Sequence, residues 1–291
     1  MSTTSDARSL DREAIRRTQP SIGGVAWPTI VFGIAIAAGY GLTFFAVTQG
    51  DLNLVAGFFI NGLLVYAAYT ILHETVHANV SGFGQPARWY NETLGYVSGF
   101  IMAVPLSIHR ISHLAHHRRT NDPEADPDMV SAIEGRPGLV SLSMASLRSV
   151  AKQYTFFFGP AWSRATTRDR RAATCEIVLA VGGRAALALA GYPMEVLVLT
   201  VFANLLGNFI IVALFSVAVH HPNAEQGRYL DTSTVVFSGW LNGPITWLWL
   251  WQNYHSIHHL FPRVPFYRYA EVFDRIDDIM VLQGAPIHRI G

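Results

Sequence analysis

Three clusters of histidine, far apart in the sequence, hold most of the side chains that could do chemistry in this chain. Eight of the twelve histidines fall in these boxes, which are residues 73–77 (HETVH), 113–117 (HLAHH) and 255–259 (HSIHH). The spacing of three or four residues within each box places its histidines on one face of a helix. Neutral imidazole is a common ligand of transition metals. Eight imidazoles are too many for one ordinary ion, so they indicate two ions and suggest the chemistry of iron and dioxygen.

Other interpretations of the boxes stay open at this point. The first box also matches the H-E-x-x-H pattern of zinc metalloproteases, with Glu74 as general base, but one further ligand would complete such a site. The other two boxes would then have no role. Bis-histidine haem ligation is a further alternative, although adjacent histidine pairs do not suit axial ligation. A last alternative is that the histidines are ordinary polar residues at helix ends. Eight imidazoles would then each need hydrogen-bond partners and would add nothing to packing.

The composition indicates a membrane protein. Of the 291 residues, 51% are hydrophobic and only 14% are charged, whereas soluble domains carry about 25% charged residues. The single cysteine, Cys175, excludes an internal disulfide, a cysteine-ligated iron–sulfur cluster and a cysteine-rich zinc site within the chain. No basic patch alternates with aromatic residues, so no nucleic-acid partner is expected. The first twenty residues carry four arginines and no apolar core, and do not resemble a cleaved secretory signal.

The elements that must position the boxes are four apolar segments, predicted to span the membrane at residues 25–47, 52–72, 173–191 and 194–219. At 1.5 Å per residue each can cross a hydrocarbon core of about 30 Å. Segments 93–108 and 235–251 are apolar but interrupted by proline, and are expected at the interface. Segment 137–172 is expected to be an amphipathic surface segment.

We predict an all-α integral membrane protein with three parts: a polar cytoplasmic arm at 1–22, a membrane domain at 23–270 and a cytoplasmic tail at 271–291. Of the 21 Lys and Arg residues, 20 lie in segments 1–22, 78–172 or 220–291, and the exception is Arg184. By the positive-inside rule, both termini and all three boxes are cytoplasmic. Arg184 is expected to snorkel or to pair with Glu176 or Glu195, because a charge within a span is costly.

The chain resembles the membrane fatty acid desaturase and hydroxylase superfamily, which comprises non-haem di-iron oxidases with three histidine boxes and includes carotenoid hydroxylases and ketolases. The resemblance rests on the boxes, on Thr120-Asn121-Asp122-Pro123-Glu124-Ala125-Asp126-Pro127 after the second box, and on the flanks of the third box, Asn253-Tyr254 and Leu260-Phe261-Pro262. It extends from about residue 50 to residue 270. It implies four transmembrane helices with a cytosolic helical cap that holds a histidine-rich di-iron site.

The resemblance implies that two iron ions are bound by the box histidines and by a further histidine at the exit of the last span. These implied ligands are His73, His77, His113, His116, His117, His220, His255, His258 and His259. Acyl-CoA desaturases carry Asn one turn before the extra histidine, whereas this chain has Ser216 there.

Several polar residues near the boxes could support the ligands from behind. These candidates are His109, Asp122, Asp126, Ser216, His221 and Asn253. Each has an ordinary alternative: a polar residue at a helix start, a solvated turn or a helix cap.

The activity implied is dioxygen-dependent oxidation of a lipid C–H bond, with a fatty acyl desaturase as the leading interpretation. The alternatives within the superfamily are a carotenoid hydroxylase or ketolase and a fatty acid or alkane hydroxylase. The chain has no cytochrome b5 sequence, no nucleotide-binding glycine loop and no iron–sulfur cysteine set. Electrons are therefore expected from a separate ferredoxin or cytochrome b5-like donor with its reductase.

Overall fold

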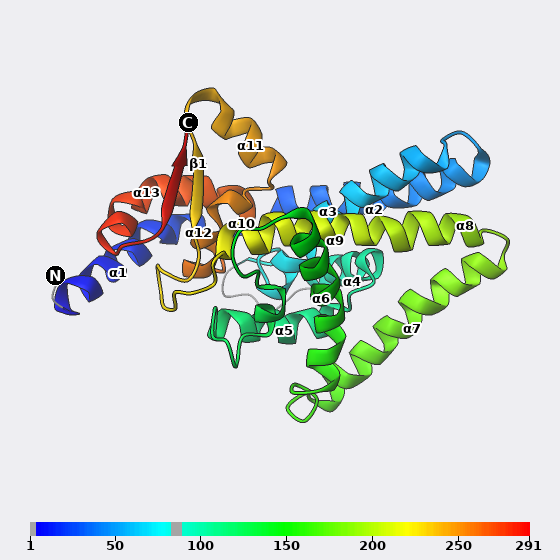
Figure 1. The fold of residues 1–291 in the computed structure, drawn as a ribbon, viewed down its shortest axis with the longest axis horizontal. Helices are drawn as coiled ribbons and strands as arrows, with labels where there is room; N and C mark the ends of the chain where they lie inside the picture. Colours follow the sequence, from blue (N-terminus) through cyan, green and yellow to red (C-terminus); the bar gives the residue numbers. More distant parts are fainter. Residues whose placement is uncertain (1–3, 83–88) are drawn as a thin grey trace.

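The computed structural model describes residues 4–82 and 89–291, and within them the chain is almost entirely helical. Four helices are long and apolar enough to cross a membrane: α2 (Trp27–Gln49), α3 (Leu54–Val76), α7 (Thr167–Leu189) and the interrupted helix Pro193–His220. In Figure 1 these helices extend toward one end of the molecule, whereas both termini lie at the other end. The predicted fold class, a four-span helical membrane protein, is confirmed.

The helix that contains the predicted third span begins at Thr167, six residues before the apolar segment expected from residue 173. The cause is a capping box at Thr166 and Asp169, in which each side chain accepts a hydrogen bond from the other residue's backbone N–H. The second span extends past residue 72 to Val76, so that His73 lies within the helix and His77 directly follows it.

The fourth span is not a regular α-helix. Its segments in order are α8 (Pro193–Val196), a π-helical segment (Leu197–Phe202), α9 (Ala203–Ile211), a second π-helical segment (Val212–Val217) and α10 (Ala218–His220). Such wide turns occur frequently at functional sites, and the second one leads directly to His220.

Small residues bring α3 and α9 into close contact. A Cβ atom at Gly207 would lie 2.5 Å from Cγ1 of Val65, and one at Gly62 would lie 2.6 Å from Cδ2 of Leu206. Without side chains at these positions the two backbones approach closely, as is common between membrane helices.

Helices α4 (Trp89–Met102) and α5 (Leu106–Arg118) meet at an angle of 97°. This bend agrees with the apolar segment 93–108, which the sequence predicted to be interrupted by proline. Glu176 of α7 caps the start of α5, since it accepts hydrogen bonds from the backbone N–H of Leu106 and the hydroxyl of Ser107. Arg184, which was expected to snorkel or to pair with Glu176 or Glu195, forms no ion pair with either carboxylate among the described residues. Its guanidinium donates instead to backbone carbonyls, at 3.0 Å from each, including that of Ile101.

A cap at the other end combines the two terminal regions. It contains α1 (Thr4–Thr18), α12 (His255–Leu260), α13 (Tyr269–Leu282) and the parallel pair β1 (Thr234–Phe237) and β2 (Ile287–Ile290). Helix α1 packs on α13, and Arg17 bonds to Asp278 at 2.9 Å. The expected division at residue 270 falls inside α13, so it marks no break between elements.

The remaining elements connect span and cap. They are α6 (Leu139–Phe158), which runs across the spans in Figure 1, α11 (Asn242–Leu248) and the 3₁₀ turns Gln19–Ser21, Pro127–Ser131, Gly239–Leu241, Gln252–Tyr254 and Phe266–Arg268.

Candidate metal centre

Two adjoining groups of imidazoles lie where the spans meet the cap. In each group the candidate ligand nitrogens lie within 4.8 Å of one another. The first group is His73, His77, His113, His117 and His258, and the second is His116, His220 and His259. His255 stands beside both groups, with its ring centroid 4.8 Å from that of His259 and 5.2 Å from that of His258. All nine histidines singled out by the sequence are thus brought together.

The local structure explains this convergence. His73 lies in the last turn of α3, and His77 directly follows that helix. His113 and His117 lie one turn apart on the same face of α5. The two pairs face each other, and the ring centroids of His77 and His113 are 5.1 Å apart. The last span supplies His220, whose ring lies 5.1 Å from that of His116. Four separate elements therefore contribute, since α12 adds the third box.

Several ring nitrogens in these groups lack protein partners or face one another. Nε2 of His117 lies 3.0 Å from Nε2 of His113 and 2.8 Å from Nε2 of His258. Among the described residues, both ring nitrogens of His73 and Nε2 of His259 are buried without any hydrogen-bond partner. Burial of unpaired polar atoms is costly, so a cation that accepts their lone pairs fits this arrangement.

The protonation state also suits a metal ion. Burial, and then the neighbouring imidazoles, hold the pKa of His255, His258 and His259 well below the ordinary value for histidine. These rings are therefore neutral at pH 7, and a neutral imidazole is the form that binds metal ions.

Partners on the far side of several rings fix which nitrogen carries the proton. Nδ1 of His116 donates to Asp126 at 2.9 Å, and Nδ1 of His255 donates to Oε1 of Gln252 at 2.8 Å. Nδ1 of His258 lies 3.0 Å from the hydroxyl of Tyr269. The donated bonds leave Nε2 of His116 and His255 with a lone pair, as in many metal sites.

Asp126 is the best supported of the expected residues behind the ligands. Besides His116, its carboxylate accepts the backbone N–H groups of Asn121 and Asp128, both at 2.8 Å. The side chain is 1% exposed. Asp126 therefore joins the second box to the turn that follows it.

The structure places three other candidates elsewhere. Asp122 accepts N–H groups of its own turn, from Glu124 and Ala125, and Asn253 donates to Val235 O and Thr246 Oγ1. Nε2 of His221 lies 2.7 Å from the carbonyl oxygen of Gly135. None of these three side chains contacts a box histidine through a hydrogen bond among the described residues, because each serves a turn or a joint between elements.

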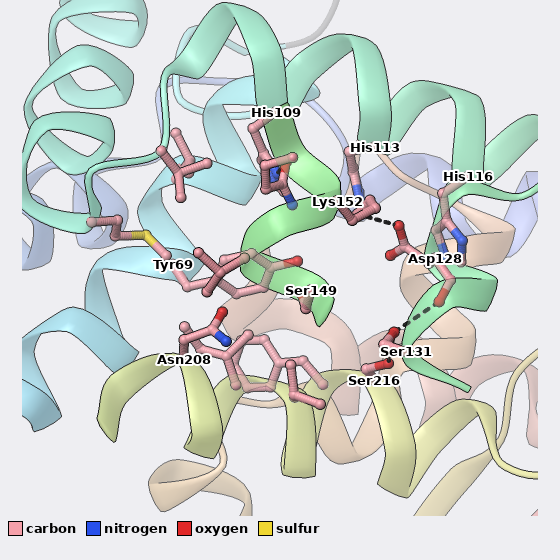
Figure 2. Close-up of a pocket in the computed structure, with 18 of the residues that line it drawn as sticks. Tyr69, His109, His113, His116, Asp128, Ser131, Ser149, Lys152, Asn208 and Ser216 are labelled. Atoms are coloured by element: carbon pink, nitrogen blue, oxygen red, sulfur yellow. Dashed lines mark hydrogen bonds and ion pairs between the residues drawn. The ribbon is translucent and has the colours of Figure 1, made fainter. Parts of the chain in front are cut away.

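Ser216 and His109 lie beside the site without supporting a ligand through a hydrogen bond. The hydroxyl of Ser216 is 3.4 Å from that of Ser131, and Nδ1 of His109 is 3.3 Å from Oε1 of Gln153. Both residues line a cavity that reaches His113, His116, His220 and His255 (Figure 2). The cavity is apolar on the side formed by residues such as Leu72, Met102 and Phe215.

Sequence reasoning missed Gln252 and Tyr269. Gln252 stands one turn before His255, and a polar residue at that spacing from a box could have been noticed. Tyr269 begins another helix, eleven residues after His258, and no local pattern indicates it.

These features define a class: a helical membrane protein in which span ends and cap surround two adjoining imidazole groups beside an apolar cavity. The family model described as fatty acid desaturase matches residues 52–291. The chain therefore belongs to the membrane fatty acid desaturase superfamily, and the resemblance seen in the boxes is confirmed.

Two curated relatives are similar to most of the chain. The sphingolipid delta(4)-desaturase DES1 of Drosophila melanogaster is 26% identical over 222 residues, which are 75% of this chain and 64% of that protein. The acyl-lipid 8-desaturase of Rebecca salina is 24% identical over 245 residues, 74% of this chain and 53% of that protein. The chain spans less than two thirds of the length of either relative.

Proposed function

We propose that the chain binds two iron ions at the two imidazole groups and uses dioxygen to oxidise an unactivated C–H bond of a lipid, as a fatty acyl desaturase. The observation that carries this proposal is the pair of adjoining, mostly buried imidazole groups, with ring nitrogens that lack protein partners, beside a cavity lined in part by apolar residues. The desaturases among the relatives favour removal of two hydrogens over insertion of oxygen.

The ligands in this proposal are the nine histidines that the sequence singled out. Irons bound there would supply the reductive activation of dioxygen. The chain's own contribution is positioning: Asp126, Gln252 and Tyr269 hold their histidines in one orientation, and the apolar wall keeps water away from the alkyl chain.

An external electron donor and a cytoplasmic location of the cap are parts of the same proposal. The cap holds α1, α13 and the third box, and Figure 1 shows both termini at its end of the molecule. With the arginine distribution, this favours cytoplasmic termini and boxes. A ferredoxin or cytochrome b5-like donor would then dock on the cap.

A carotenoid hydroxylase or ketolase is the second candidate, favoured by one observation. Ser216 faces the cavity where acyl-CoA desaturases have Asn, so this part of the site differs from that subgroup. Hydroxylation and desaturation leave products of different mass, and one experiment separates them.

The test is expression in a host that makes both fatty acids and β-carotene, with metal analysis of the purified chain and mass spectrometry of lipids and pigments. We expect about two irons per chain and a product two hydrogens lighter; a product one oxygen heavier would favour the second candidate. One zinc and no iron would overturn the oxidase and favour a metalloprotease. His116→Ala should abolish product formation, whereas His288→Ala, an exposed histidine of β2, should not.

A further inference from the structure

Helix α6 exposes apolar side chains and buries polar ones, which is the reverse of an ordinary surface helix. Its exposed residues include Leu139, Val140 and Leu147, with 73%, 78% and 52% of their surfaces accessible, whereas Lys152 and Gln153 are buried at 6% and 8%. Ser149, Lys152 and Gln153 share one face at a spacing of three and four residues and line the cavity beside the imidazole groups. Buried polar groups near a membrane are costly, so a polar face directed inward calls for a partner.

One acceptor in this cavity has no partner. His109 is 3% exposed, and its Nδ1 must donate to Gln153, because an amide oxygen only accepts. Nε2 of His109 therefore carries a lone pair, and among the described residues no donor reaches it. The ring lines the cavity on the α5 side, opposite Ser149 and Asn208 (Figure 2).

The lysine and the aspartate that line the cavity pair with each other. Nζ of Lys152 lies 2.5 Å from Oδ1 of Asp128 and 3.3 Å from Oγ of Ser112. A carboxylate or phosphate in the cavity would have no cation of its own, because Lys152 is already paired. An uncharged group that both donates and accepts, such as a hydroxyl or an amide, could bond to His109 and to Ser149 without this cost.

The polar wall is also close to the metal ligands. The ring centroid of His109 lies 5.4 Å from that of His113. Carbon–carbon bonds are about 1.5 Å long, so a few bonds span this distance.

From these four observations, and on the basis of the proposed function, we propose that the polar wall formed by His109 and Ser149 binds an uncharged hydroxyl or amide group of the lipid. The oxidised carbon then lies within a few bonds of that group. The substrate class is a long-chain lipid that carries such a group near the reacting carbon, rather than a plain acyl chain oxidised at its middle.

Binding to the metal-free full chain in nanodiscs tests this inference independently of catalysis. The probes are 3-hydroxyoctadecanamide, octadecanoate and octadecane, each measured by displacement of a fluorescent alkyl probe. We expect the hydroxyamide to bind most tightly. Ser149→Ala and His109→Phe should each weaken its binding about three- to tenfold, the loss expected for one hydrogen bond, and should leave octadecane binding unchanged.

Ser143→Ala is the matched control, because Ser143 is a partly exposed residue of the same helix that does not line the cavity, and its hydroxyl bonds to the Leu139 carbonyl. It should bind all three probes like the parent chain. Tightest binding of octadecanoate, or equal losses for hydroxyamide and octadecane in Ser149→Ala, would overturn the inference. Such a result would leave the di-iron proposal intact, whereas absence of iron would overturn the di-iron proposal without changing the binding result.

Discussion

Replacement of Asp126 by Asn tests how the turn after the second box holds a metal ligand. The carboxylate accepts three N–H groups, from His116, Asn121 and Asp128, at 2.8 to 2.9 Å. An asparagine keeps one acceptor oxygen and places an NH₂ group where the other oxygen stood. At least one of the three donors then faces another donor.

The magnitude follows from these contacts. A hydrogen bond to a charged group contributes about 1.5–3 kcal/mol, and a buried donor left unpaired costs about 1–3 kcal/mol. Asp126→Asn should therefore cost about 2–4 kcal/mol, shared between the turn and the orientation of His116. For metal binding, loss of such a partner lowers affinity about 10- to 100-fold. We expect this loss in the group of His116, His220 and His259.

The assay is anaerobic titration of the metal-free chain with ferrous iron against a competing chelator, for the parent, Asp126→Asn and Asp122→Asn. Asp122 is the matched control, because it lies in the same turn and its carboxylate accepts N–H groups of that turn and pairs with Arg119, but bonds to no box histidine. Asp126→Asn should retain one tight iron and weaken the other, and Asp122→Asn should retain both. Two tight irons in Asp126→Asn, or equal losses in both variants, would refute the role of Asp126.

Three further variants test other parts of the molecule. Tyr269→Phe removes the hydroxyl beside His258 and should weaken iron binding about tenfold in the same titration; unchanged affinity would contradict the role given to Tyr269. Burial raises the pKa of Asp231 to about 6, so its ionisation opposes folding as pH rises from about 4 through 6. Asp231→Asn should therefore melt a few degrees higher than the parent at pH 7.5 and at the same temperature at pH 4; an equal shift at both pH values would point to another cause. Gly207→Ala should lower the melting temperature by several degrees because its Cβ would meet Val65, whereas Gly243→Ala, with nothing within 4 Å, should have a small effect; similar melting of both would refute the close contact.

The boxes and the spans could be predicted because both depend on short-range patterns. Histidines three or four residues apart share a helix face wherever the helix lies, and an apolar run of about twenty residues can span a membrane in any fold. Four such spans place the ends that carry or precede the boxes on one side of the membrane, and this is sufficient to anticipate that His73, His220 and His258 converge.

The residues behind the ligands could not be predicted in this way. Asp122 and Asp126 are the same residue type in the same turn, and only the turn's backbone decides which one faces His116. Asn121 has a left-handed φ of 61°, and its N–H group bonds to Asp126. Tyr269 depends on the packing of α13 against α12, which no sequence spacing encodes. The helix of the third span begins before its apolar segment for a related reason, since a local cap at Thr166 starts it within a polar turn.

The sequence predicted that the α6 region is amphipathic, but it did not indicate which face of the helix is buried. An amphipathic surface segment was expected at residues 137–172, and amphipathicity alone does not say which face is buried. In a soluble protein the apolar face packs inward, because water surrounds the fold. Next to a membrane the surroundings are apolar, so Leu139 and Val140 can face outward and Lys152 inward. Lys152 and Gln153 are stable on the inner face because each has a polar partner there: Lys152 pairs with Asp128, and Gln153 accepts from Nδ1 of His109. Under the inference drawn above, Ser149 and His109 on the same wall add a site for a polar group of the lipid, so the boxes would determine the chemistry and this wall would determine which part of the lipid reaches them.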